Sequence, residues 1–171
     1  MHIRPEIPDD APAIAALNRE AFGGDHEAGL IDRLRAQGNI VASLVAVENG
    51  MIVGHILFSD LAVELDGHPI RTVALAPMCV RNDRRRRGIG SALVHTGLDV
   101  VHAAGFRAVI VVGHPEYYPR FGFSSHLAGK LDCPFPGSAF MALELVPGAL
   151  RGTSGKVTYP AAFGIGEPPS R

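Results

Sequence analysis

The sequence predicts an α+β (mixed α/β) fold, and three observations on the order of its segments support that class. The first 36 residues place apolar side chains at helical spacing. Residues 44–80 change to strand-like apolar runs, which Asn49-Gly50 and Asp66-Gly67 interrupt as turn signals. A helical pattern then begins near Gly88 and leads to a short β-branched run, Val109–Val112. A strand–helix–strand unit beside an antiparallel meander predicts a mixed sheet with one right-handed crossover.

The N-terminal segment predicts one strand and two helices. The strand covers Met1–Arg4. Asp9 or Asp10 is expected to cap a first helix, which ends at Gly23. A second, shorter helix covers Glu27–Ala36.

The middle of the chain predicts a meander of three long strands. Leu44–Val47 begins it, and Met51–Phe58 returns as the partner strand, with the strand pattern continuing to Leu65. Ile70–Val80 is expected to be the third antiparallel strand.

The remainder predicts one helix and three further strands. The helix begins near Gly88 and ends at Gly105, and the apolar run that follows it is expected to be a buried strand. Late strands are expected at Phe140–Val146 and Lys156–Tyr159. With 171 residues, 47% of them hydrophobic, we expect one domain over residues 1–165 and a loose tail at 166–171.

Charge and cysteine content disfavour several classes of protein. A net charge of -1 does not favour a nucleic-acid partner, although Arg84–Arg87 are consecutive. Cys79 and Cys133 provide neither a disulfide framework nor a metal-ligand spacing, so we expect free thiols and no metal. The charged start and the lack of an apolar stretch of about 18 residues predict no signal peptide, no membrane partner and a cytoplasmic location.

The arginine-rich turn before the long helix has the features of a phosphate site. A helix start leaves backbone N–H groups without internal partners and carries partial positive charge. Gly88 and Gly90 let an anion approach the backbone, and Arg84–Arg87 can add forked, charge-assisted hydrogen bonds. The absence of a Walker lysine and of Gly-x-Gly-x-x-Gly disfavours P-loop and Rossmann sites.

Two motifs about 30 residues apart carry a family resemblance. Residues 85–90, Arg-Arg-Arg-Gly-Ile-Gly, resemble the Arg/Gln-x-x-Gly-x-Gly/Ala motif of the GNAT superfamily of N-acetyltransferases. Ala76–Val80 is similar to the family's fourth strand and Ser91–Leu93 to its third helix. Tyr117–Phe123 resembles the Tyr-x-x-x-Gly-Phe segment after the fifth strand. The resemblance covers residues 40–125 and is strongest to a bacterial subgroup of predicted acetyltransferases.

This resemblance implies a fold and a cosubstrate. The fold is a mostly antiparallel sheet of six to seven strands flanked by helices, in which parallel strands Ile70–Val80 and Arg107–Val112 splay apart around acetyl-CoA. Backbone groups near Met78, Cys79 and Val80 would bind the pantetheine arm and the thioester carbonyl. The residues expected to hold the pyrophosphate are Arg85, Arg86, Arg87, Gly88, Ile89, Gly90 and Ser91.

The catalytic groups are predicted from the same resemblance and from acid–base chemistry. Tyr118 lies four residues before Gly122, where the family commonly places the tyrosine that protonates the departing thiolate. In the alternative arrangement Tyr118 packs in the core and Tyr117 faces the cleft. His114 follows the buried strand and is a candidate base or substrate contact.

The acceptor side is predicted less sharply. His26 and Glu27 lie between the first two helices, a region that covers the acceptor in this family, and they are candidate substrate-binding residues. His55 lies within a strand and is expected to be structural. Cys79 is expected to be a small apolar residue rather than an acetylated nucleophile.

We therefore expect an acetyl-CoA-dependent N-acetyltransferase that moves an acetyl group directly to an unidentified primary amine. A catalytically inactive acyl-CoA-binding sensor or interaction module of the same fold is the alternative. A nucleic-acid binder that uses Arg84–Arg87 is a weaker third class. An apolar strand near the C-terminus could pair with a second subunit and give a homodimer.

Overall fold

A computed structural model describes residues 1–135 and 137–165 of the chain, so the predicted tail at 166–171 lies outside the described residues. The chain forms two compact units. The N-terminal unit contains Met1–Ser59 and Leu75–Ala104, and the C-terminal unit contains Asp60–Ala74 and the chain from Gly105 onward. The boundary between them falls inside β3 (Met51–Leu65) and β4 (His68–Val80).

The described residues form one eight-stranded mixed sheet with the order β1-β2-β3-β4-β5-β7, and β8 pairs with both β3 and β6. The pairs β1–β2, β2–β3, β3–β8 and β5–β7 are antiparallel, whereas β6 and β8 are parallel. This confirms the mixed α/β class, but the expected six to seven strands were too few. The remaining strands are β1 (His2–Pro5), β2 (Ile40–Glu48), β5 (Ala108–Val112), β6 (Leu131–Asp132), β7 (Phe140–Glu144) and β8 (Gly155–Thr158).

Three of the helices were predicted from apolar periodicity. They are α1 (Ala11–Phe22), α2 (His26–Ala36) and α3 (Ile89–Ala103). No sequence pattern indicated α4 (Ser125–Ala128) or β6, because four and two residues are too short to display a period. A 3₁₀ turn occupies Tyr118–Phe121.

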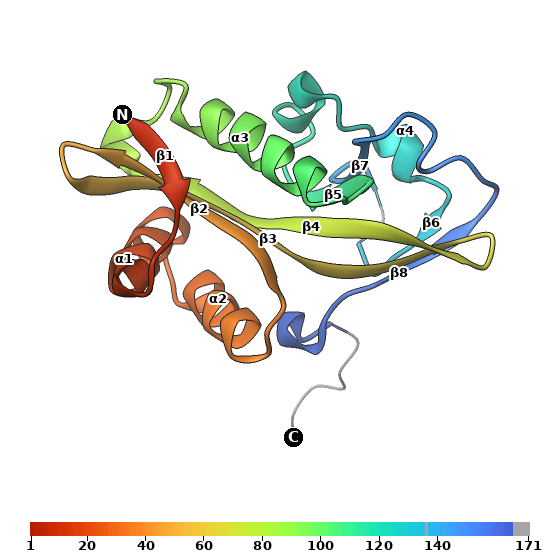
Figure 1. Cartoon of the computed structure of the whole chain (residues 1–171), viewed down its shortest axis with the longest axis horizontal. Helices are drawn as coiled ribbons and strands as arrows, with labels where there is room; N and C mark the ends of the chain where they lie inside the picture. Colours follow the sequence, from red (N-terminus) through yellow and green to blue (C-terminus); the bar gives the residue numbers. More distant parts are fainter. Residues whose placement is uncertain (136, 166–171) are drawn as a thin grey trace. The chain divides into compact units, whose positions relative to one another are not determined.

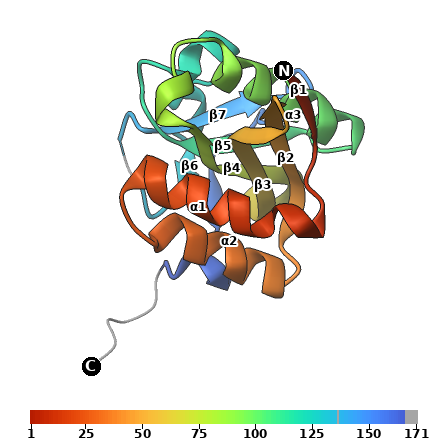
Figure 2. The same cartoon turned by 90° about the vertical axis from the view of Figure 1, so that its left-hand side faces the viewer.

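Within the N-terminal unit, α1 and α2 cover one face of the sheet and α3 covers the other (Figures 1 and 2). Alternation along β3 explains the two layers, since successive side chains of a strand point to opposite faces. Gly54 faces α3, and a Cβ there would lie 2.9 Å from Leu93 of that helix. The next residue, His55, faces α1, where its ring meets Asn18. A second glycine, Gly97, receives the ring of Phe58, so α3 packs closely on the strand.

The prediction that the Asp10 side chain caps the first helix was wrong. Asp10 stands at the N-cap position of α1, but its side chain makes no capping hydrogen bond to that helix. Its carboxylate instead accepts the backbone N–H of Ile7 at 2.8 Å and pairs with Arg4 at 2.7 Å. The carboxylate therefore fixes the chain between β1 and α1 rather than the first turn of the helix.

His55 is part of a buried polar cluster, as expected for a structural residue. It is fully buried, with one ring nitrogen 2.9 Å from Ser43 Oγ and the other 3.3 Å from the Asn18 amide. Burial, together with the nearby charge of Arg35, lowers the pKa of His55 to about 3. The imidazole is therefore neutral at physiological pH and is unsuited to act as a base in solvent contact.

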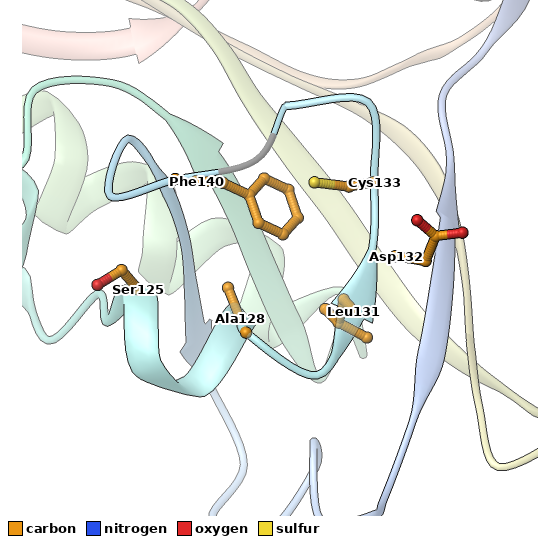
Figure 3. A pocket seen from close by; sticks show the side chains of 8 residues that line it. Ser125, Ala128, Leu131, Asp132, Cys133 and Phe140 are labelled. Atoms are coloured by element: carbon orange, nitrogen blue, oxygen red, sulfur yellow. The ribbon is translucent and has the colours of Figure 1, made fainter.

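The C-terminal unit contains a cavity of about 220 Å³ beside the start of β7. Figure 3 shows the ring of Phe140 and the thiol of Cys133 facing each other across it, with the carboxylate of Asp132 pointing away. The cavity is lined by Ser125, Ala128, Gly129, Leu131, Asp132, Cys133, Gly137 and Phe140.

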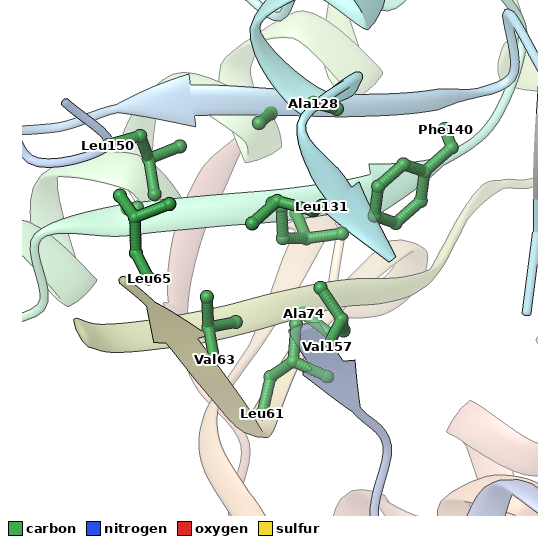
Figure 4. Packing of buried hydrophobic residues seen from close by; sticks show 12 residues of the cluster. Leu61, Val63, Leu65, Ala74, Ala128, Leu131, Phe140, Leu150 and Val157 are labelled. Carbon is green, nitrogen blue, oxygen red and sulfur yellow. The ribbon is translucent and has the colours of Figure 1, made fainter. Parts of the chain in front are cut away.

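One hydrophobic cluster holds the C-terminal unit together (Figure 4). Leu61, Val63 and Leu65 alternate along β3 and all point into it. They pack with Leu131 of β6 and Val157 of β8. Burial of these two side chains therefore holds both strands in place, although each strand is short. Each fully buried side chain of this size contributes roughly 1.5–3 kcal/mol relative to exposure.

Both late strands have backbone partners within the chain, and the homodimer prediction stays a prediction. Ser124 bridges Ala142 of β7 on the side away from β5, with two backbone hydrogen bonds of 2.9 and 3.0 Å. β8 lies between β3 and β6. The feature on which the homodimer prediction rested, an apolar strand open for pairing, is thus covered at its centre within the chain itself.

Candidate active site

The turn between β4 and α3 combines two left-handed residues with the start of a helix. Arg86 has a φ of 64° and Gly88 a φ of 79°, so two left-handed residues alternate with Arg87. Turn conformations of this kind can direct successive N–H groups toward one side of the backbone and form an anion-binding concavity. At Gly88 a side chain would be strained, although no atom lies within 4 Å of where its Cβ would stand.

The start of α3 adds further donors to this turn. Gly88 is its N-cap and offers no side chain that could cap the helix. The first bond along the helix runs from Ala92 N to Gly88 O at 3.0 Å. The N–H groups of Ile89, Gly90 and Ser91 precede that bond, so helix geometry leaves them without an internal acceptor. An external anion would satisfy them and would be favoured by the helix dipole.

The four consecutive arginines divide into two groups. Arg84 is committed to carboxylates, with Nε 3.0 Å from Glu48 Oε1 and Nη1 3.0 Å from Asp83 Oδ2. By contrast, within the described ranges no carboxylate pairs with Arg85, Arg86 or Arg87. These three side chains are exposed, and their guanidinium groups are free to meet phosphate oxygens. The three arginines predicted to bind the pyrophosphate, Arg85, Arg86 and Arg87, are therefore the ones without a carboxylate partner among the described residues, and their role stays a prediction.

The end of β4 carries the residues that the family resemblance places at the thioester. Met78 and Val80 are half-buried and Cys79 is buried. Burial raises the pKa of the Cys79 thiol to about 12, with Arg85 lowering it and Glu27 raising it. Two charged side chains therefore act on this part of the strand, and Cys79 remains a protonated thiol at neutral pH. This agrees with the expectation that Cys79 is a small apolar residue.

The two acceptor-side candidates differ in their surroundings. Glu27, in the first turn of α2, is half-buried, and its charge acts on Cys79. His26 is exposed at the start of the same helix. The charge of Glu27 raises the pKa of the Cys79 thiol near the end of β4. It does so because α2 covers that face of the sheet.

In the C-terminal unit, Tyr118 is held in a buried aromatic environment. It is 7% exposed, and its ring packs edge-on against Tyr117 and Phe123, with ring centroids 5.1 and 5.7 Å away. Its face lies against Gly113, where a Cβ would overlap the ring. Burial raises the pKa of the Tyr118 phenol above its ordinary value, and the neighbouring Tyr117 raises it further. No hydrogen bond joins its hydroxyl to another residue in the described part of the chain.

The remaining candidates of this segment are Tyr117 and His114. Tyr117 is half-buried, and the Arg120 guanidinium lies 4.6 Å from its ring centre. The His114 side chain is exposed, while its carbonyl accepts the N–H groups of Tyr117 and Tyr118 at 3.0 and 3.3 Å. The backbone of His114 thus fixes the turn that presents Tyr118. A role for its imidazole as base or substrate contact stays a prediction.

Among the described residues, no helix is long and apolar enough to cross a membrane. No cluster of three or more histidine, cysteine, aspartate or glutamate residues in the same ranges could hold a metal ion.

The fold, with the turn at residues 85–91 that we call the phosphate turn, is typical of one class of acetyltransferases. Residues 2–125 match the family described as an acetyltransferase (GNAT) domain, and the chain belongs to this family. It is 40% identical over 166 residues to the uncharacterized N-acetyltransferase YhbS of Escherichia coli K12, covering 95% of this chain and 98% of that protein. The E. coli protein YjhQ, also named an uncharacterized N-acetyltransferase, is 36% identical over 131 residues, covering 74% of this chain and 71% of its own.

Solved structures agree with this assignment. The crystal structure of E. coli YhbS in complex with CoA has a TM-score of 0.87 and 38% identity, covering 97% of this chain and 93% of that one. A GNAT acetyltransferase from Brucella melitensis in complex with acetyl-CoA has a TM-score of 0.79 and 34% identity, with 95% and 97% covered.

Proposed function

We propose that this chain is an acetyl-CoA-dependent N-acetyltransferase that transfers the acetyl group directly to a primary amine. The observation that carries the proposal is the turn at residues 85–91, where left-handed residues, unpaired arginines and a helix start converge. CoA and acetyl-CoA in the E. coli and B. melitensis relatives support the same cosubstrate here. The residues of the turn fit a pyrophosphate because they supply both backbone donors and unpaired cations.

Each named group then has one task. The turn holds the pyrophosphate through Arg85, Arg86, Arg87, Gly88, Ile89, Gly90 and Ser91. Backbone groups of Met78, Cys79 and Val80 align the pantetheine arm and polarise the thioester carbonyl. Tyr118 supplies the proton that the leaving thiolate needs.

The chemical step moves one acetyl group and two protons. The neutral amine nitrogen attacks the thioester carbonyl carbon, the C–S bond breaks, and the sulfur takes the proton of Tyr118 Oη. The amide nitrogen loses one proton to solvent or to a base, and the phenolate recovers its proton from water. For a lysine-like amine, deprotonation at pH 7 costs about 4.6 kcal/mol, from roughly 1.36 kcal/mol per pH unit.

Glu27 is our candidate to bind the amine and help remove its proton. It is half-buried and negatively charged, and its field reaches the end of β4, so it would attract an ammonium and receive a proton directly or through water. His26 and His114 are assigned as secondary contacts of the acceptor. The high pKa of Cys79 supports direct transfer, because a protonated, buried thiol is a poor nucleophile.

The test is a titration of the protein with acetyl-CoA and CoA, followed by a panel of amines with Tyr118→Phe as the control. We expect the protein to bind both acetyl-CoA and CoA. We also expect it to release CoA from acetyl-CoA in the presence of at least one amine. Absence of CoA binding by folded protein would refute the proposal. Binding without transfer to any amine would favour the inactive sensor instead.

A further inference from the structure

A continuous set of ion pairs ties the phosphate turn to the β2–β3 hairpin. Arg81 forms a bidentate ion pair with Asp83, with Nε 2.7 Å from Oδ1 and Nη2 2.8 Å from Oδ2. Asp83 Oδ2 also lies 3.0 Å from Arg84 Nη1. Arg84 in turn reaches Glu48, the last residue of β2, at 3.0 Å. The backbone N–H of Arg81 is bonded to Val53 O of β3 at 2.8 Å. We call Arg81, Asp83, Arg84 and Glu48 the brace.

The turn that follows the brace is conformationally costly. A residue with a Cβ is strained in the left-handed region relative to the right-handed one, and Arg86 is in that region with a φ of 64°. Such conformations persist only where the surroundings hold them. The brace is the set of side-chain contacts directly before Arg86 that holds the turn from the sheet side.

The brace is also better placed than an ordinary surface ion pair. The side chains of Arg84 and Glu48 are 22% and 25% exposed, and Arg84 is shared between two carboxylates. Isolated exposed pairs contribute little, whereas connected and partly buried ones hold their geometry more firmly.

We propose that Glu48 and Arg84 are positioning residues that set the phosphate turn in its CoA-binding conformation before the cosubstrate arrives. The inference rests on the proposed function, since it assumes that the turn binds CoA. Preorganisation of this kind strengthens binding by removing the cost of ordering the loop. Neither residue is required to touch the phosphates.

A competing role for the Glu48–Arg84 pair predicts the opposite change in the Kd for CoA. If Glu48 only competed with phosphate for Arg84, removal of its charge would release a guanidinium and tighten CoA binding. If the pair is a brace, removal of the charge loosens the turn and weakens CoA binding. The direction of the change in Kd therefore distinguishes the two roles.

The experiment compares Glu48→Gln, Arg84→Gln and the double variant with a matched control, Glu6→Gln. Glu6 forms an ion pair of 3.1 Å with Arg35 in the same unit and is 18% exposed, but it is remote in sequence from the turn. Readouts are the Kd for CoA, the Kd for pantetheine, which lacks the phosphates, and the thermal midpoint. Pantetheine is measured by competition at high concentration.

We expect Glu48→Gln and Arg84→Gln each to weaken CoA binding about 10-fold, and the double variant to be no weaker than the worse single one. Pantetheine binding should stay within about twofold, because the brace acts only on the phosphate turn. Glu6→Gln should leave both constants unchanged while lowering the thermal midpoint as much as Glu48→Gln does.

Three results would overturn the inference. They are tighter or equal CoA binding by Glu48→Gln, equal weakening of CoA and pantetheine, and fully additive single effects. If the wild type binds CoA and Glu48→Gln binds it equally well, only this inference fails. If the folded wild type binds no CoA, the proposed function fails and the inference with it.

Discussion

The phosphate turn at residues 85–91 and the tyrosine segment at residues 113–123 differ in their exposure, charge and backbone conformation. The turn is exposed and cationic, and its backbone adopts left-handed conformations at Arg86 and Gly88. The tyrosine segment places a buried phenol among aromatic rings. The first is suited to hold charge by backbone and guanidinium donors, whereas the second is suited to keep one proton on an oxygen. Binding and chemistry should therefore respond to different substitutions.

A glycine in each region shows the same contrast at the level of one residue. Gly88 has a φ of 79° and no atom within 4 Å of where a Cβ would stand, so it is required for conformation. Gly113 is required for space, because a Cβ there would overlap the Tyr118 ring. Alanine at either position is a small change with a different physical consequence.

The largest expected effect is on the chemistry of the tyrosine segment. Tyr118→Phe removes the hydroxyl and keeps the ring, so the packing with Phe123 persists. Loss of a general acid lowers kcat by about 10²–10⁴-fold, while the Kd for CoA should change little. Steady-state kinetics with the acceptor found in the amine panel, together with CoA titration, measure both. A kcat within a few-fold of wild type would remove Tyr118 from the mechanism.

Tyr117→Phe is the matched control, because this half-buried neighbour also contributes a ring to the cluster. Its kcat should stay within a few-fold of wild type. The pH profile adds a second check. Because burial raises the pKa of Tyr118, its proton is retained beyond pH 10, and kcat should not fall below that pH through its ionisation. A basic limb near pH 9 that disappears in Tyr118→Phe would contradict this.

The next largest effect is on binding at the phosphate turn. Gly88→Glu introduces a negative charge and a strained side chain where the pyrophosphate is expected, so the Kd for CoA should rise on the order of 100-fold. Gly38→Glu is the control, since Gly38 is also exposed, has a φ of 72° and has no atom within 4 Å. Gly38→Glu introduces the same strain and the same negative charge, but it lies after α2 and outside the phosphate turn. Equal losses in the two variants would show that the turn has no special affinity for anions.

The sequence predicted the positions of the turns better than it predicted contacts between distant residues, because turn signals are local. Asn49-Gly50, Asp66-Gly67 and Gly88 are turn signals that their own φ angles confirm. The commitment of Arg84 to Glu48, 36 residues away, has no local signal. Only the folded chain brings the end of β2 to the loop after β4.

Local sequence patterns also could not predict which side chains are buried. Tyr118 and Tyr117 are adjacent and chemically identical, yet one is buried and the other half-buried. The difference depends on Gly113 and Phe123, which the chain brings to the same ring. Likewise, Asp10 is a reasonable cap by position, but Arg4 and Ile7 take its carboxylate.

A smaller effect should follow from filling the space at Gly113. Gly113→Ala places a methyl group against the ring of Tyr118 and forces it to move. Overpacking of this kind costs about 1–3 kcal/mol of stability, and a displaced hydroxyl should lower kcat roughly 10-fold. The thermal midpoint and kcat measure the two. CoA affinity should be kept, which separates this variant from Gly88→Glu.

The smallest effect comes from the backbone of Arg86. Arg86→Gly and Arg86→Ala both remove the guanidinium, so any difference between them reports the left-handed conformation. Glycine adopts a φ of 64° freely, whereas alanine is strained there by about 1 kcal/mol. Arg86→Gly should therefore bind CoA about 5-fold more tightly than Arg86→Ala.

Arg87 makes this comparison decisive, because among non-glycine residues only Asn49, Asp66 and Arg86 of the described chain have positive φ. At Arg87 the preference should reverse, and Arg87→Ala should bind CoA at least as tightly as Arg87→Gly, since glycine adds flexibility without relieving strain. Calorimetric titration of the four variants gives the two ratios. If glycine and alanine are equivalent at both positions, the turn is not preorganised, and its affinity for CoA arises from charge alone.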